Sequence, residues 1–392
     1  MNKKNHYILF IIAIIFLAFN LRPAITSIGP IIGIIRDDLE LSNWTVGFIT
    51  SLPLLAFAVM SPIAPRIANR TGNERALLYG LLLLLLGIIV RSIPFIPLLF
   101  IGTTLIGIGI AMVNVILPSL IKGSFPTKIG LMTGLYTTSM SIFAAIGSGV
   151  SFPITEKLQF NWELSLLSWG LIAIVGIIIW MFAMKTKGED KDIQLHEPSA
   201  KKMLRSSIAW QVTAFMGLQS FLFYVTISWL PEILIADGYD ATTAGWFVAY
   251  MQFISLPATF LTPIVAGRLK DQRVVVYVFG TCAIFGYAGL LYHPTFLLTV
   301  LSITLIGFAL GASISLALAL LGLRTKNARQ AGELSGMAQS FGYLLASIGP
   351  ILIGFLFDIS GLWFSSIIAL IVVTVIMIAF GVGASRDKYA LD

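Results

Sequence analysis

The stretch YILFIIAIIFLAFNLRPAITSIGPIIGII, residues 7–35, decides the fold of this chain. It is apolar over enough residues to cross a bilayer, and its one charged residue, Arg22, lies near the middle. Inserting an isolated cation at that depth costs at least ~2.5 kcal/mol, so another group must compensate the charge. The stretch therefore predicts a transmembrane helix that carries an arginine with a functional role.

The composition is that of a membrane protein. Of the 392 residues 57% are hydrophobic and only 11% are charged, whereas charged residues make up about a quarter of a soluble domain. The mean hydropathy is +0.94. Because the apolar runs have helical length, we expect an all-α bundle in a lipid bilayer rather than a barrel. The first run is predicted to be a transmembrane helix and not a signal peptide.

The charged and reactive residues exclude several classes of protein. The net charge of +7 does not indicate a nucleic-acid partner, because the basic residues lie in short loops between apolar runs. The one cysteine, Cys282, lies in a predicted span, and His6, His196 and His293 lie in loops or near the chain ends. We therefore predict no enzyme, no metal site and no cofactor. A membrane sensor stays open as an alternative, although the chain holds no stretch that would form a soluble output domain.

Apolar runs bounded by Gly, Pro or charged residues predict twelve transmembrane helices. Their expected limits are residues 7–35, 44–66, 75–93, 97–121, 128–154, 163–184, 206–235, 242–267, 273–292, 295–322, 329–356 and 361–384. With both termini cytoplasmic, 21 of the 25 basic residues fall on the inner side, and the outer segments hold only Arg36, Arg91 and Lys157. The positive-inside rule favours this arrangement, which leaves Arg22 as the one cation expected inside a span.

The longest connection divides the chain into two halves of six helices. It predicts an N-terminal bundle at 1–185, a cytoplasmic linker at 186–204 and a C-terminal bundle at 205–392. The halves resemble each other, since the tripeptide LIG at 105–107 recurs at 305–307. Such a repeat implies a pseudo-twofold axis along the membrane normal, a substrate site between the halves, and alternating access by rocking of one half against the other.

Residues 64–75, APRIANRTGNER, resemble the loop signature between helices two and three of the major facilitator superfamily, with Asn69 in place of its usual Asp and Pro65 in place of its first Gly. Further stretches resemble the cyanate and 2-nitroimidazole permease branch of that superfamily: NLRPA at 20–24, LQSFLFY at 218–224 and WLP at 229–231. The resemblance implies a twelve-helix carrier of a small molecule, a monomer in the bacterial inner (cytoplasmic) membrane.

None of the 18 acidic residues is expected at the depth of Arg22. We therefore predict that Arg22 faces a central cavity and holds an anionic or polar planar solute, since a guanidinium presents a planar fork of donors. The alternative is a structural role, in which backbone carbonyls near Pro23, hydroxyl groups and water neutralise Arg22. The other candidate contacts are polar residues at a similar depth: Asn20, Asn114, Tyr136, Thr137, Gln219, Tyr224, Tyr250, Gln252, Gln339 and Tyr343. The alternative for each of these residues is a structural role, in which its side chain forms a hydrogen bond that packs two helices together.

The expected gating residues are charged and lie near the cytoplasmic ends of spans: Arg70, Arg75, Asp271, Arg329 and Glu333. Glu333 is the acid nearest to the central region, and it follows Arg329 by four residues. We therefore predict an i,i+4 ion pair at this position rather than a proton site. Uniport, anion exchange and symport stay open, and proton coupling stays open with them.

Small residues have a structural interpretation. Six glycines are expected to permit close helix approach: Gly107, Gly109, Gly130, Gly134, Gly147 and Gly149.

The sequence as a whole predicts a secondary active or facilitative transporter of a small anionic or polar planar solute. Efflux of nitroheterocyclic or other toxic compounds is the alternative within transport, although the stretch GSG at 147–149 lacks the core of the antiporter motif of drug exporters.

Overall fold

The computed structural model describes residues 3–28, 31–41, 43–156, 161–186, 200–291 and 295–391. The helices in these ranges are α1 (Lys3–Phe19), α2 (Pro23–Thr26), α3 (Ile32–Asp38), α4 (Asn43–Met60), α5 (Ala64–Thr71), α6 (Asn73–Arg91), α7 (Ile96–Ser124), α8 (Ile129–Glu156), α9 (Trp162–Thr186), α10 (Ala200–Met203), α11 (Ser207–Ala236), α12 (Ala241–Arg268), α13 (Arg273–Gly289), α14 (Phe296–Leu323), α15 (Ala328–Ser360) and α16 (Trp363–Ala384).

The helix lengths agree with the twelve predicted spans. In the described ranges, ten spans are long and apolar enough to cross a membrane, and a helix pair bent by 51°, Leu52–Met60 with Ala64–Thr71, brings the number to eleven. The twelfth predicted span corresponds to α13, an apolar helix of 17 residues. The twelve-helix membrane fold expected from the sequence is confirmed.

The first span is broken, which corrects the single continuous helix expected from the sequence. α1 ends at Phe19, α2 begins at Pro23, and α3 begins at Ile32. Pro23 causes the first break because it has no backbone N–H and its ring clashes with the carbonyl four residues earlier. The turn before it tightens, since the N–H groups of residues 20 and 21 donate to carbonyls three residues back at 3.1 Å. The sequence around Arg22 is therefore a helix break and not a regular helix.

Cap residues set several of the helix limits. Ser206, Asp240 and Asn327 each accept a hydrogen bond from the backbone N–H three residues later, at the starts of α11, α12 and α15. Gly72 ends α5 and precedes α6 with a φ of +88°, a conformation that residues with a side chain rarely adopt. This glycine is the one Gly in the loop stretch that resembles the superfamily signature.

Contacts between Cα atoms divide the chain into two compact units. Unit 1 is Met1–Leu120 with Leu135–Pro198, and unit 2 is Ile121–Gly134 with Ser199–Asp392. The bundle limits at residues 185 and 205 stay a prediction. Residues 187–199 of the predicted linker lie outside the described residues.

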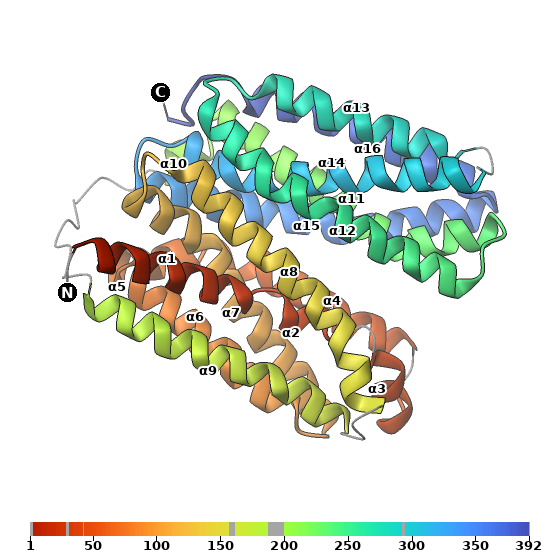
Figure 1. The fold of residues 1–392 in the computed structure, drawn as a ribbon, viewed down its shortest axis with the longest axis horizontal. Helices are drawn as coiled ribbons and strands as arrows, with labels where there is room; N and C mark the ends of the chain where they lie inside the picture. The colour runs from red at the N-terminus through yellow and green to blue at the C-terminus, as the bar shows by residue number, and fades with distance from the viewer. Residues whose placement is uncertain are drawn as a thin grey trace. The chain divides into compact units, whose positions relative to one another are not determined.

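In unit 1, α9 lies beside both α1 and α6 (Figure 1). The Trp180 indole of α9 is fully buried there and donates to the carbonyl oxygen of Glu74 on α6 at 3.0 Å. Its ring also packs against Phe10 of α1, with centroids 5.7 Å apart. One aromatic residue thus joins the three helices near one end of the unit.

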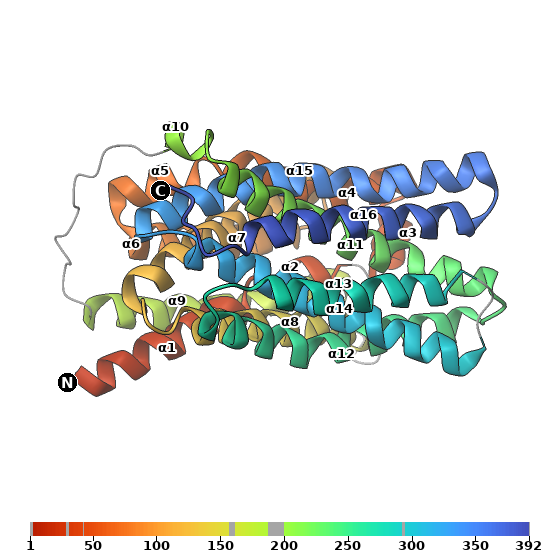
Figure 2. The same ribbon diagram turned by 90° about the horizontal axis from the view of Figure 1, so that it is seen from above.

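In unit 2, α13, α14 and α16 run side by side (Figure 2). α12 packs against α14, and α11 packs against α15 and α16. Large apolar side chains nevertheless remain exposed on both units, for example Leu171 at 68% and Leu297 at 77%. A helical protein exposes such residues where lipid replaces water as the solvent.

A buried arginine, Arg324, fixes the end of the chain to unit 2. Its Nε donates to the carbonyl oxygen of Ala384 at 3.1 Å, and its Nη2 donates to the carbonyl oxygen of Ser385 at 3.0 Å and to Gln272 Oε1. Burial lowers the pKa of the Arg324 guanidinium, and the exposed Asp387 carboxylate, 4.0 Å away, opposes that shift. The arginine therefore joins the start of α13 to the ends of α14 and α16.

Candidate substrate site

The break in the first span exposes backbone carbonyls that need new donors. The Asn20 side-chain amide donates to the carbonyl oxygen of Phe16 at 2.8 Å. The Arg91 guanidinium donates through Nη1 to the carbonyl oxygen of Ala24 at 2.5 Å. Arg22 itself has a partly exposed side chain and is the residue immediately before α2. Buried polar groups must be paired, so these bonds stabilise the non-helical turn on which Arg22 lies.

Two glycines let neighbouring helices approach this turn. A Cβ added at Gly147 of α8 would lie 2.7 Å from Thr26 Oγ1 and 3.0 Å from the Cα of Pro23. A Cβ added at Gly176 of α9 would lie 2.6 Å from the side-chain nitrogen of Asn20. Thr26 Oγ1 also donates to the carbonyl oxygen of Ala144 on α8 at 3.0 Å. α8 and α9 therefore hold the turn from two directions.

The prediction of close approach holds for five of the six glycines named from the sequence. Gly107 and Gly109 face backbone atoms of α4 and α6, and Gly130 and Gly134 face backbone carbonyls of α12 within unit 2. Gly149 is the exception, because a Cβ added there would meet no described atom within 4 Å. Its position on α8 is exposed, so the expectation for Gly149 was wrong.

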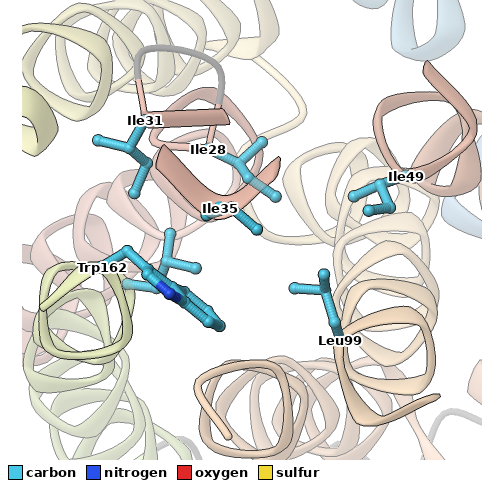
Figure 3. Close-up of a cluster of buried hydrophobic side chains, with 7 residues drawn as sticks. Ile28, Ile31, Ile35, Ile49, Leu99 and Trp162 are labelled. Carbon is cyan, nitrogen blue, oxygen red and sulfur yellow. The ribbon is translucent and has the colours of Figure 1, made fainter. Parts of the chain in front are cut away.

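A hydrophobic cluster anchors the far side of the broken span. Ile28, Ile31 and Ile35 pack with Ile49, Leu99, Leu166 and Trp162 from α4, α7 and α9 (Figure 3). The Trp162 indole also donates to Asp38 Oδ2, at the end of α3, at 2.7 Å. The break therefore lies between two well-packed segments, and this packing restricts the position of the turn that carries Arg22.

The other predicted contacts of unit 1 are buried. Asn114 lies on α7 at 8% exposure, and Tyr136 and Thr137 lie on α8 at 2% and 3%. Phe143 of α8 stacks on Phe19 of α1 with ring centroids 3.8 Å apart, which brings α8 alongside the end of α1. The stacked pair thus joins the end of α1, which Asn20 follows, to α8, which carries Tyr136 and Thr137.

The predicted contacts of unit 2 have varied surroundings. Gln219 is fully buried on α11, where its amide nitrogen donates to Ser220 Oγ at 2.7 Å and to the Met216 carbonyl oxygen at 3.0 Å. Its amide oxygen has no hydrogen-bond partner among the residues that the structure describes. Tyr224, one turn further along α11, is partly exposed and packs edge-on against Phe223. Gln219 thus keeps one acceptor available, while Tyr224 presents a hydroxyl at a partly exposed position.

The remaining unit 2 residues differ in their hydrogen bonds and in their exposure. Tyr250 shares a hydrogen bond of 2.9 Å with Thr304, which joins α12 to α14 as a packing contact. Gln339 is buried and donates to Ser335 Oγ at 2.9 Å on its own helix, α15. Two further candidates differ in exposure: Gln252 is partly exposed on α12 and Tyr343 is buried on α15.

The expected gating residues include one confirmed ion pair. Arg329 Nε lies 3.3 Å from Glu333 Oε1, as the i,i+4 spacing predicts. Asp271 instead pairs with Arg273, whose Nε donates to Asp271 Oδ2 at 2.7 Å. This hydrogen bond holds the pKa of the Asp271 carboxyl below its ordinary value. The last two residues of this set, Arg70 and Arg75, are exposed at the end of α5 and the start of α6.

Arg91 is a buried residue that sequence reasoning assigned to an outer segment. It is the last residue of α6 and only 1% exposed. Its Nε and Nη2 have no hydrogen-bond partner within the described ranges. An arginine at a span end ordinarily extends toward water, and no pattern in the sequence indicates that this one turns inward.

Comparison with known proteins identifies the family. The sequence matches the Major Facilitator Superfamily profile over residues 8–296. The chain belongs to the Major Facilitator Superfamily. Over 388 residues it is 50% identical to a member named uncharacterized transporter YycB, from Bacillus subtilis (strain 168), with 99% of this chain and 96% of the relative covered. Over 389 residues it is 38% identical to the 2-nitroimidazole transporter of Escherichia coli (strain K12), with 99% and 98% covered.

Two further members of the superfamily bear on the branch and on the fold. The cyanate transport protein CynX of Escherichia coli (strain K12) is 25% identical over 352 residues, with 90% of each chain covered. The solved structure of the proton:xylose symporter XylE superposes with a TM-score of 0.76 at 12% identity, over 100% of this chain and 98% of the other, which shows a shared fold. This protein is therefore a multi-pass membrane transporter and not an enzyme, and it resembles the cyanate and 2-nitroimidazole branch.

Proposed function

We propose that this transporter carries a small anionic or polar planar solute and that Arg22 is its principal contact. The break in the first span carries the proposal. It places Arg22 directly before α2, on a turn whose neighbouring carbonyls accept hydrogen bonds from Asn20 and Arg91. The partly exposed Arg22 presents a planar fork of charged donors, which suits an anion or a strongly polar solute.

The names of the relatives agree with this solute class. One relative is named for cyanate, an anion, and another for 2-nitroimidazole, a flat ring with a polar nitro group. Both are small molecules with oxygen or nitrogen atoms that accept hydrogen bonds from a guanidinium. In the proposed site Asn114 and Tyr136, which belong to the same unit as Arg22, assist it as neutral polar or aromatic contacts.

The proposal is tested with purified protein in liposomes. Uptake of radiolabelled cyanate is measured for the unchanged protein, for Arg22→Gln and for the control Arg36→Gln, whose arginine is exposed and paired with Asp37 at 2.9 Å. Loss of a hydrogen-bonded charge costs about 1.5–3 kcal/mol, so we expect Arg22→Gln to weaken the apparent affinity roughly 10- to 150-fold and Arg36→Gln to leave it unchanged. Equal affinity in a normally folded Arg22→Gln variant would refute the role of Arg22.

Efflux of nitroheterocyclic compounds is the second candidate, because of the 2-nitroimidazole relative. The same liposomes discriminate it when loaded with 2-nitroimidazole, since a carrier of neutral nitroheterocycles would export the compound and tolerate the loss of the Arg22 charge. Repeating each assay with an imposed pH gradient tests proton coupling, which is absent if the rates do not depend on the gradient.

The proposed carrier is a monomer in the bacterial inner membrane with both termini cytoplasmic. The excess of basic residues in alternate connections supports this orientation. Arg70, Arg75, Asp271 and the pair of Arg329 with Glu333 would then act at the cytoplasmic gate. Protease or thiol-reagent access to tagged termini in sealed vesicles tests the orientation.

A further inference from the structure

Arg91 is buried at a close contact between α6 and α7. Its backbone is packed against α7 at Gly102, where an added Cβ would collide with the N, Cα and Cβ atoms of Arg91. The end of α6 therefore lies directly against α7, and the arginine is among the largest fully buried side chains of the described chain. The Arg91 guanidinium turns into the protein and so loses the hydration that the outer membrane interface would offer. The hydrogen bond that it makes must compensate this loss.

The contact of Arg91 is with the helix break that carries Arg22. Its Nη1 donates to the carbonyl oxygen of Ala24 at 2.5 Å, two residues after Arg22 and within α2. α2 ends at Thr26, so Ala24 lies in its last turn, where carbonyls lose their donors within the helix. The N–H groups of residues 25 and 26 both donate to the carbonyl oxygen of Arg22, at 2.9 and 3.0 Å. Arg91 and the Arg22 backbone are thus connected through one short helical turn.

We propose that Arg91 is a positioning residue, which holds α2 in place and thereby sets the affinity of Arg22 for the solute. The proposal rests on the proposed role of Arg22 in binding. A bond from a buried cation to a carbonyl is a strong hydrogen bond, so it restricts the short helix more than a neutral contact would. Without it, the break would be less restricted, because α2 has only four residues and depends on contacts with other helices to keep its conformation.

The first experiment measures whether Arg91 holds the break. Hydrogen–deuterium exchange of a peptide covering residues 20–28 is followed by mass spectrometry in Arg91→Met, Arg91→Lys and the control Ser92→Ala. Ser92 is a neighbour whose hydroxyl donates only to the carbonyl oxygen of Ile88 in its own helix, at 2.8 Å. We expect exchange about 10- to 100-fold faster in Arg91→Met, a smaller change in Arg91→Lys and no change in Ser92→Ala. Unchanged exchange in folded Arg91→Met, or in Arg91→Lys if the methionine variant does not fold, would overturn the proposal.

The second experiment separates positioning from a merely structural role. Cyanate affinity is measured for Arg91→Met, for Arg22→Gln and for the double variant, as a double-mutant cycle. We expect Arg91→Met to weaken affinity about tenfold in the unchanged protein and to have no effect once Arg22 is Gln. An equal effect in both backgrounds, or none in either while Arg22→Gln weakens binding, refutes positioning and leaves the proposed function intact. If Arg22→Gln has no effect, the proposed function fails and the positioning role falls with it.

Discussion

Gly147 and Gly149 lie two residues apart on α8 and meet opposite surroundings. A Cβ at Gly147 would lie 2.7 Å from Thr26 Oγ1 and 3.0 Å from the Cα of Pro23, whereas a Cβ at Gly149 would meet no described atom within 4 Å. Pro23 presents a backbone atom that cannot rotate away. We therefore predict that alanine is tolerated at Gly149 and destabilises the protein at Gly147.

The magnitude follows from two opposing effects. Replacing Gly by Ala in a helix gains about 0.8–1 kcal/mol at either position, because the unfolded chain loses freedom. Overpacking a close contact costs about 1–3 kcal/mol, and it applies to Gly147 alone. The difference between Gly147→Ala and Gly149→Ala is therefore about 1–3 kcal/mol, since the gain common to both cancels.

The assay compares the apparent melting temperatures of the two variants in the same detergent. For a unit of 150–250 residues the expected difference is roughly 2–12 °C, with Gly147→Ala melting lower. Thr26→Ala combined with Gly147→Ala should recover part of the loss, because it removes the oxygen that the new methyl group meets. Equal melting temperatures of the two alanine variants would refute the argument that α8 is packed directly against the break.

Three more predictions concern unit 2. Arg324→Met removes three hydrogen bonds to two chain segments, so it should lower the apparent melting temperature and expose the C-terminal residues to proteolysis. The control Arg386→Met, at an exposed residue, should do neither. The hydrogen bond from Arg273 depresses the pKa of the Asp271 carboxyl. The stabilisation from this bond is therefore present above about pH 4 and is lost as the pH falls through the lower pKa of the folded state. Asp271→Asn should make stability depend less on pH in the acid range and cost less than about 1 kcal/mol at pH 7, as measured by unfolding at several pH values. Tyr287→Phe removes a buried hydrogen bond of 2.7 Å to Thr226 of α11 and should lower the stability by about 1–3 kcal/mol, which the same melting assay measures. An unchanged melting temperature would mean that the Thr226 hydroxyl finds another hydrogen-bond partner.

The sequence alone determined the membrane class, the number of spans and the family. Hydrophobic runs of bilayer length report on the local solvent of each helix, so they can be interpreted without knowing how helices pack. The pair of Arg329 with Glu333 was predictable for the same reason, since residues four apart on a helix are neighbours whatever surrounds them. The loop stretch and the NLRPA stretch indicated the superfamily and its branch.

Only the tertiary structure decided how Arg22 is presented. Pro23 breaks the helix locally, but the three-part first span also depends on donors from elsewhere. One of them, Arg91, lies 67 positions after the Ala24 whose carbonyl oxygen it contacts. The same holds for Gly147 and Gly149, which are alike in sequence and differ in which face of α8 meets another helix. Arginines at helix ends ordinarily extend toward water. Arg91 turns inward because its backbone packs against Gly102 and because the Ala24 carbonyl oxygen accepts its hydrogen bond. Neither contact can be inferred from the residues next to Arg91 in the sequence.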